Sequence, residues 1–114
     1  MKKMLSVSVF SLGLAFAGNA FAGFQGPGLD PTTVAKALDM GDEAAVVLVG
    51  QIEKSLGNEK YQFKDATGTI VVEIDDEDWR GVNVKPEDTI IIRGEVDKEL
   101  LKTEIDVDSV ELKK

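Results

Sequence analysis

The sequence predicts a mainly β protein, a small barrel of five strands with one short helix before the first strand and another between the third and fourth. Five segments after residue 44 are rich in β-branched residues or alternate between apolar and polar side chains, which is the period of a half-buried strand. Turn-forming residues separate these segments at short intervals, as they do in small all-β domains. The strands must therefore cover one another to bury a common core.

The clearest element is a β-hairpin over residues 61–74. Its turn at residues 65–68 contains an aspartate whose side chain can accept a hydrogen bond from the turn backbone, and a glycine that tolerates a positive φ. Because side chains alternate across a strand, one face of this hairpin is apolar. The side chains on that face are Tyr61, Phe63, Ile70, Val72 and Ile74. We expect them to form the centre of the core.

A short helix is expected before the first strand. Asp30 can cap its N-terminus, and Pro31 suits a first helical turn, where no backbone N–H donor is needed. Gly41 would end the helix. The side chains on its buried face would be Val34, Ala35 and Leu38.

The first strand is expected over residues 44–54, which are strongly β-forming. Gly50 in its middle predicts a bulge or a sharp bend of the kind that curls a strand into a barrel. Residues 55–59 then form a loop with a Gly-Asn turn, which leads into the hairpin.

After the hairpin, the acidic run of residues 75–78 favours a short helix, because acidic side chains are stabilised near a helix N-terminus. Trp79 would point back to the barrel and plug one end of it. The remaining elements are a fourth strand over 89–96, a turn at 97–99 and a last strand over 104–112. The apolar alternation of the last strand changes phase near Ser109, which predicts a β-bulge there.

The N-terminal residues 1–22 have the pattern of a cleaved signal peptide. Two lysines precede an uncharged apolar run, and Ala20-Phe21-Ala22 provides a small-residue cleavage site. The alternative is an uncleaved membrane anchor, which the short apolar run disfavours. We therefore expect a periplasmic protein without a membrane segment after cleavage, in which residues 23–29 form a flexible lead-in and residues 30–114 the folded domain.

The chain is acidic, with 21 acidic and 13 basic residues and a formal charge of −8. Residues 1–22 hold two lysines and no acidic residue, so the mature chain would carry −10. A negative field repels phosphate backbones and favours basic peptides, cations or neutral ligands. The chain has no histidine and no cysteine, so it lacks the commonest general base and cannot form a disulfide.

The order of strands and helices fits an OB-fold. Seven motifs, in their order and spacing, resemble the bacterial OB-fold (BOF) family, also called the YgiW/YdeI stress-tolerance family. They are Val49-Gly50-Gln51-Ile52, Tyr61-Gln62-Phe63-Lys64-Asp65, Thr67-Gly68-Thr69-Ile70, Val72-Glu73-Ile74, Trp79-Arg80-Gly81, Arg93-Gly94-Glu95-Val96-Asp97 and Ile105-Asp106-Val107. The resemblance implies a periplasmic barrel tied to envelope stress, which binds a small or peptide-like ligand and not nucleic acid, with no established enzymatic activity.

The sequence offers no recognisable catalytic motif. An acid-base pair such as Asp65 and Glu73 is conceivable, but turn and strand-face carboxylates are usually only solvated. The acidic run 75–78 lacks the spacing and the glycine of a calcium loop, so we assign no metal ligand and interpret it as helix capping. Asp106 and Asp108 are interpreted as the solvated face of the last strand. We expect a binding module that is not an enzyme and has no cofactor, and whether the acidic run holds a cation stays open.

OB-folds bind ligands on the outer face of strands two and three, together with the loops between strands one and two and between four and five. The candidate ligand-binding residues are therefore Lys54, Asn58, Glu59, Gln62, Lys64, Thr69, Glu73, Asp97 and Glu99. Tyr61 and Phe63 face the core, so this surface lacks aromatic rings for stacking nucleic-acid bases. The expected partner is a small molecule, a cationic peptide or a cell-wall fragment. The alternatives are a structural or protein-interaction module of the envelope, or a weak divalent-metal binder.

Overall fold

The computed structural model describes residues 29–114, which fold into a closed five-stranded barrel. Its elements are α1 (Val34–Leu38), β1 (Ala45–Gly57), β2 (Lys60–Asp65), β3 (Gly68–Ile74), the 3-10 helix η1 (Asp76–Trp79), β4 (Ile90–Glu99) and β5 (Lys102–Leu112). This arrangement confirms the OB-fold barrel and its two short helices. The expected signal peptide and residues 23–28 of the lead-in lie outside the described residues.

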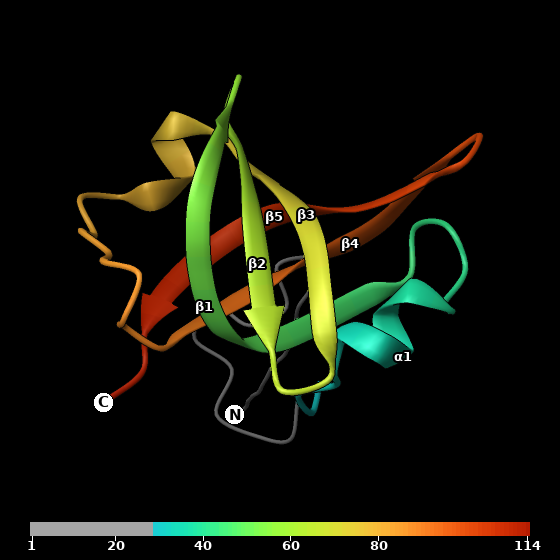
Figure 1. Cartoon of the computed structure of the whole chain (residues 1–114), viewed down its shortest axis with the longest axis horizontal. Helices are drawn as coiled ribbons and strands as arrows, with labels where there is room; N and C mark the ends of the chain where they lie inside the picture. Colours follow the sequence, from blue (N-terminus) through green and yellow to red (C-terminus); the bar gives the residue numbers. More distant parts are fainter. Residues whose placement is uncertain (1–28) are drawn as a thin grey trace, which may run out of the picture.

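The strands close in the order β1-β2-β3-β5-β4, with β4 returning to β1. β3 and β5 pair in parallel, and the other neighbours are antiparallel. The first half of β1 pairs with β4 and its second half with β2, so β1 must bend between them (Figure 1).

Gly50 lies at this bend. A Cβ atom on Gly50 would lie 2.1 Å from the carbonyl oxygen of Lys64, so only glycine lets the two strands approach so closely. The register shifts of β1 occur farther along, between Ile52 and Lys54 and between Ser55 and Gly57. The sequence thus located the bend correctly, but the bulges are not at Gly50.

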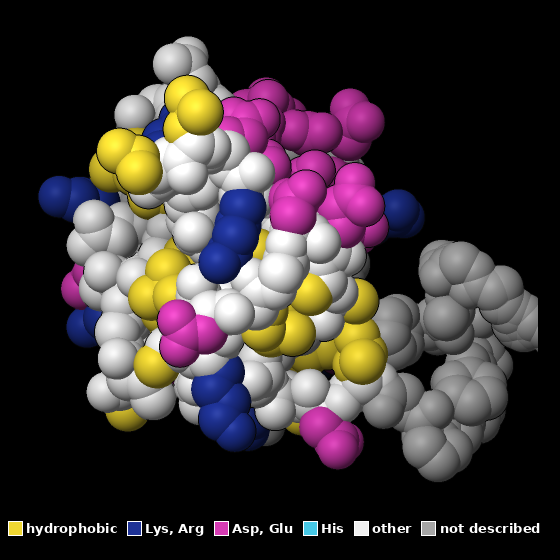
Figure 2. Space-filling view, turned by 90° about the vertical axis from the view of Figure 1, so that its right-hand side faces the viewer, with side chains coloured by type: hydrophobic (Ala, Val, Ile, Leu, Met, Phe, Trp, Pro, Cys, Tyr) yellow, Lys and Arg dark blue, Asp and Glu magenta, His cyan; other side chains and the backbone are white. Residues whose placement is uncertain are grey.

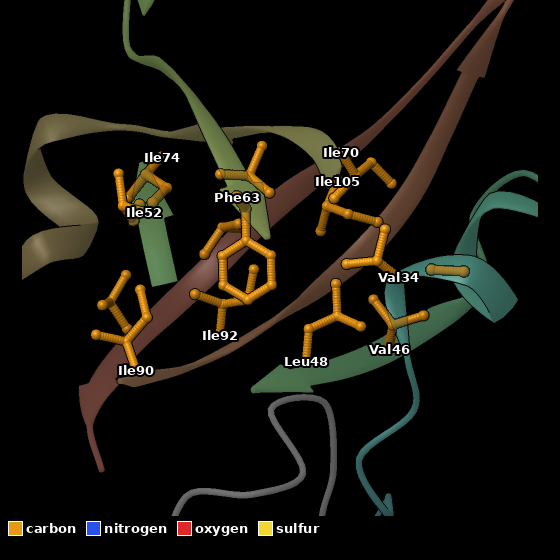
Figure 3. Close-up of a cluster of buried hydrophobic side chains, with 14 of the residues drawn as sticks. Val34, Val46, Leu48, Ile52, Phe63, Ile70, Ile74, Ile90, Ile92 and Ile105 are labelled. Atoms are coloured by element: carbon orange, nitrogen blue, oxygen red, sulfur yellow. The ribbon is translucent and has the colours of Figure 1, made fainter. Parts of the chain in front are cut away.

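The core lies inside the barrel, and the ring of Phe63 lies in the middle of the buried side chains (Figure 3). The alternation predicted for the hairpin is confirmed, because Phe63, Val72 and Ile74 are fully buried. Tyr61 is half-buried and packs against the edge of this cluster. The other members are Val34, Ala37, Val46, Leu48, Ile52, Ile70, Ile90, Ile92, Val96, Ile105, Val107 and Val110.

Two short helices lie at opposite ends of the barrel (Figure 1). Helix α1 buries Val34 and Ala37, whereas the expected face residues Ala35 and Leu38 are exposed. At the other end, Trp79 of η1 is half-buried and packs against the core, as expected.

The expected cap of α1 was wrong. Thr33 occupies the N-cap position, where its side chain accepts from the backbone N–H of Lys36 at 3.2 Å. The helix begins only at Val34, so Asp30 lies three residues before the N-cap position. The helix ends at Leu38, before Gly41.

Two of the three hairpin turns, β1–β2 and β4–β5, are tighter than the sequence predicts. β1 continues through Gly57, so the reversal consists of Asn58 and Glu59, with φ values of 55° and 65°. Likewise β4 continues through Glu99, so residues 97–99 are strand residues and the turn consists of Leu100 and Leu101. Positive φ at both turn residues, as in the β1–β2 turn, matches the twist of paired strands, whereas in the β4–β5 turn only Leu100 has a positive φ, at 51°.

The predicted bulge of the last strand is confirmed. Arg93 pairs with Ser109 and the next residue, Gly94, pairs with Val107, so β5 has one extra residue. Within residues 29–114, no helix combines the length and the apolar character needed to span a membrane.

Candidate ligand-binding face

Acidic side chains gather on the outer surface of β3 and β5. The parallel pairing places Glu73 of β3 beside Asp106 of β5, and Asp97 of β4 pairs with Glu104. Figure 2 shows Asp and Glu side chains concentrated in one region at the upper right, whereas Lys and Arg are scattered. We call this surface the acidic face, and it consists of Glu59, Glu73, Asp75, Asp78, Asp97, Glu99, Glu104, Asp106 and Asp108.

The carboxylates of the acidic face repel one another. Partial desolvation and the charge of Asp108 raise the pKa of Asp106 above its ordinary value. Partial desolvation and Asp78 raise the pKa of Asp108 in the same way, and partial desolvation and Asp106 raise that of Glu73. Desolvation is the largest cause of these raised pKa values, and the part that neighbouring carboxylates add shows that the local field is negative. A cation placed on this face would relieve the repulsion.

Lys60 balances part of the negative charge of the acidic face. Its ammonium contacts both carboxylate oxygens of Glu104 at 3.1 Å. This hydrogen bond, opposed by desolvation and assisted by Glu73 and Glu99, raises the pKa of Lys60. Lys102 approaches Glu104 less closely, at 3.9 Å. Both lysines lie beside the same carboxylate, so the charge near Asp106 and Asp108 is left largely unbalanced.

Three carboxylates of the acidic face come close enough to share a cation. Oxygen atoms of Glu59, Glu73 and Asp75 lie within 4.8 Å of one another. Glu59 is held in place because its carboxylate accepts from the backbone N–H of Asp76 at 2.8 Å and its carbonyl accepts from that of Ile74 at 2.9 Å. Oxygen ligands in such a group suit Ca²⁺, which fills its remaining coordination positions with water.

The nine predicted site residues separate into three groups. Glu59, Glu73, Asp97 and Glu99 lie on the acidic face. Gln62 and Lys64 instead contact Glu53 of β1, at 2.6 Å and 3.5 Å, with Thr69 opposite Lys64. Lys54 and Asn58 are exposed on β1 and in its turn.

The group around Glu53 is close to neutral. The hydrogen bond from Gln62, opposed by desolvation and assisted by Lys64, lowers the pKa of Glu53. Its carboxylate is therefore occupied and compensated within the protein, and this part of the predicted site has little attraction left for a charged ligand.

Asp65 and Glu73 do not form an acid-base pair. Asp65 lies at the turn of the β2–β3 hairpin, paired with Gly68, whereas Glu73 lies at the open end, paired with Lys60. The Asp65 carboxylate is also occupied by backbone donors from Val34 and Thr67. These two carboxylates cannot act on the same substrate atom.

Sequence reasoning missed most of the acidic face on β5. It predicts only an ordinary solvated strand face for Asp106 and Asp108, and it assigns Glu104 to the strand without a further role. The available signal was the alternation of acidic residues at 104, 106 and 108, combined with the parallel β3–β5 pairing typical of this barrel. The acidic run contributes Asp75 and Asp78 to the face.

Comparisons with known proteins agree with this fold. Residues 13–112 match the family model described as bacterial OB fold (BOF) protein. The calcium-regulated OB-fold protein CarO of Pseudomonas aeruginosa is 42% identical over 106 residues, which cover 91% of each protein. Protein YgiW of Escherichia coli K12 is 48% identical over 79 residues, which cover 69% of this chain and 61% of YgiW.

Solved structures show the same barrel. The structure of YgiW from E. coli superposes with a TM-score of 0.74 at 45% identity, covering 80% of this chain and 98% of that chain. The telomere capping protein Ten1 of S. pombe has a TM-score of 0.59 at 14% identity, covering 71% and 77% of the two chains, which reflects the shared fold alone. On the family match and the identity to CarO and YgiW, the chain belongs to the bacterial OB-fold (BOF) family.

Proposed function

We propose that the chain is a non-enzymatic periplasmic binding module for envelope stress tolerance, and that it binds cationic ligands such as basic peptides on the acidic face. The observation that carries this proposal is the group of unbalanced carboxylates on β3 and β5, whose pKa values are raised by desolvation and by one another. A bound cation lowers this repulsion, and the resulting attraction is the physical source of affinity.

The periplasmic location is supported by the signal-peptide pattern of residues 1–22. Intact-mass measurement of the periplasmic fraction should find a chain that begins at Gly23. A chain in that fraction that retains residues 4–21 would contradict cleavage.

The binding proposal can be tested with tetralysine as the probe. Its affinity, measured by calorimetry, should fall as salt concentration rises, because exposed charges are screened within about 8 Å at physiological ionic strength. A neutral cell-wall glycan should show little such dependence, and single-stranded DNA should not bind.

A pair of charge reversals locates the binding surface. Asp106→Lys should abolish most of the salt-sensitive binding, because it removes a carboxylate and adds a cation at the centre of the acidic face. Glu87→Lys makes the same change of charge on an exposed residue outside this face and should leave the affinity almost unchanged. Equal losses in both variants would show that tetralysine responds to net charge and not to this surface.

A second candidate function is divalent-cation binding by Glu59, Glu73 and Asp75, whose carboxylate oxygens converge within 4.8 Å. The relative CarO is described as calcium-regulated, which makes Ca²⁺ the first ion to test. An ion at a hundred times its dissociation constant would add about 2.7 kcal/mol to the free energy of unfolding.

The matched variants for this test lie in the same acidic run. Asp75→Asn should remove the Ca²⁺-dependent rise in melting temperature, whereas Glu77→Gln, outside the three carboxylates, should retain it. An unchanged melting temperature of the parent protein in millimolar Ca²⁺ would rule out this function while leaving peptide binding intact.

A further inference from the structure

A hollow of about 520 Å³ lies between β1, β2 and the segment after η1. It contains a single residue of the predicted site, Lys54, and none of the acidic face. Its apolar lining consists of Ile52, Tyr61, Trp79, Val82, Val84 and Pro86. Its size lies within the range of about 300–1,000 Å³ that is usual for small-molecule sites.

Two aromatic rings meet at the wall of this hollow. Tyr61 and Trp79 pack edge to face, with ring centroids 5.5 Å apart and an interplanar angle of 81°. Both side chains are half-buried, so part of each ring is covered by the core and part remains accessible. Trp79 therefore does more than plug the end of the barrel, because its ring also forms part of a recess open to solvent.

The rim of the hollow is locally positive. Its charged residues are Lys54, Lys85 and Glu53. Glu53 is already bonded by Gln62 and Lys64, at 2.6 Å and 3.5 Å. Among the described residues neither Lys54 nor Lys85 has an ion-pair partner within 4.0 Å. Two ammonium groups without a close ion pair thus border an apolar recess in a protein whose formal charge is −8.

We propose that this hollow binds a small amphipathic organic anion, such as an alkyl-substituted aromatic carboxylate. The apolar part would pack against Tyr61, Trp79 and Val84, and the carboxylate would lie at the rim near Lys54 and Lys85. Apolar contacts supply most of the affinity in such a recess, and the few polar groups at its rim set the orientation and the preference for charge. The site is independent of cation binding on the acidic face.

Three probes with the same apolar part and different charges test the proposal: 4-butylbenzoate, 4-butylbenzyl alcohol and 4-butylbenzylamine. The chain has one tryptophan, so its indole N–H gives one assignable NMR signal that reports on this hollow. The benzoate should shift the Trp79 signal and bind most tightly, the alcohol should bind more weakly, and the amine weakest of all.

Substitutions at the rim separate charge recognition from simple hydrophobic binding. In the double variant Lys54→Gln/Lys85→Gln, benzoate affinity should fall about two- to thirtyfold, to that of the alcohol, because exposed charge pairs each contribute modestly. Affinity for the alcohol should not change in that variant. Lys36→Gln, on the exposed face of α1, removes a lysine away from the hollow and should change neither affinity.

Three outcomes would overturn the proposal. The Trp79 signal could stay unmoved by millimolar benzoate, the amine could bind as tightly as the benzoate, or the double substitution could leave benzoate affinity unaltered. The second outcome would identify the hollow as an unselective apolar recess, of the kind that accepts a side chain of a partner protein.

Discussion

At the scale of single residues, Asp65 joins two elements that are far apart in the sequence. One carboxylate oxygen accepts from the backbone N–H of Val34 at 2.9 Å, and the other accepts from the backbone N–H and the hydroxyl of Thr67, at 2.7 Å and 2.6 Å. The Thr67 hydroxyl in turn accepts from the backbone N–H of Ala35 at 3.0 Å. The β2–β3 turn thus satisfies donors at the N-terminus of α1, a role that the sequence pattern assigns to Asp30.

Removing this carboxylate should destabilise the protein. Asp65→Ala should lower the free energy of unfolding by about 1–2 kcal/mol at pH 7, because it leaves helix-terminal donors without an acceptor. Asp30→Ala, at an exposed position before the helix, should have little effect. Urea titration of both variants measures the difference, and equal stabilities would contradict the capping role of Asp65.

The contribution of Asp65 should depend on pH. Desolvation alone would raise its pKa, but the hydrogen bonds from Thr67 and Val34 outweigh that effect and lower the pKa. A lowered folded-state pKa gives stability that is present above the unfolded pKa of about 3.9 and is lost as the pH falls through the folded value. The difference between parent and Asp65→Ala should accordingly shrink during acid titration.

At the scale of elements, glycine determines where strands can cross closely. A Cβ atom on Gly50 would meet the carbonyl oxygen of Lys64, and one on Gly94 would meet that of Asp106, both at 2.1 Å. Backbone atoms cannot move aside without disturbing the strand pairing. The position of Gly50 allowed the bend of the first strand to be predicted from the sequence. The alternation of apolar and polar side chains allowed the core residues of the hairpin to be predicted.

Gly50→Ala should cost about 3 kcal/mol or more, because the added methyl group forces the β1–β2 backbone apart. Gly41→Ala is the matched control, since apart from its two chain neighbours no residue has an atom within 4 Å of the position that its methyl group would take. Thermal unfolding of both variants tests this expectation. A Gly50→Ala protein with the same melting temperature as the parent would show that the two strands can move apart without loss of stability.

Turn positions were harder to predict than strand interiors. Leu100 and Leu101 carry no turn signal, yet they reverse the chain because the pairing of Glu99 with Lys102 extends the hairpin to its end. The pairing energy of a long antiparallel ladder overrides the weak local preference of these two residues. Local sequence patterns therefore located the strands but not the ends of the strands.

At the scale of the whole molecule, the acidic face depends on topology. Glu73 and Asp106 meet because β3 and β5 pair in parallel, although more than thirty residues separate them in the sequence. Glu59, Glu73, Asp97 and Glu99 were predicted from the general OB-fold binding surface. Their neighbours on β5 could not be found from local patterns. Alternating acidic residues indicate that one face of a strand is exposed to solvent, but they do not indicate whether the adjacent strands carry carboxylates on the same face.

The acidic face should reduce stability at neutral pH. Desolvation and nearby carboxylates raise the pKa of Asp106 in the folded state. Asp106 therefore lowers stability as the pH rises above its unfolded pKa of about 3.9, and this cost is fully present above the folded pKa. Asp106→Asn should raise the melting temperature at pH 7, and the gain should disappear near pH 3.

Glu87→Gln is the control for this measurement, because it removes a carboxylate from an exposed loop outside the face and should change stability by less than about 0.5 kcal/mol. If Asp106→Asn melts below the parent at pH 7, the carboxylate makes a stabilising contact and the face is not repulsive. Peptide binding would then need a source of affinity other than relief of that repulsion.

The closing strand of the barrel also constrains the order of folding. β5 follows both of its partners in the sequence, and it pairs with β3 on one side and β4 on the other. Until β5 is in place, β3 and β4 each present a row of unpaired backbone groups, and the contacts that close the barrel are long-range and slow to form. A chain that emerges N-terminus first therefore cannot complete its fold early. On the export route proposed above, such a delay would keep the chain unfolded while it crosses a translocation channel, and the unpaired edges of β3 and β4 would need protection until β5 has crossed as well.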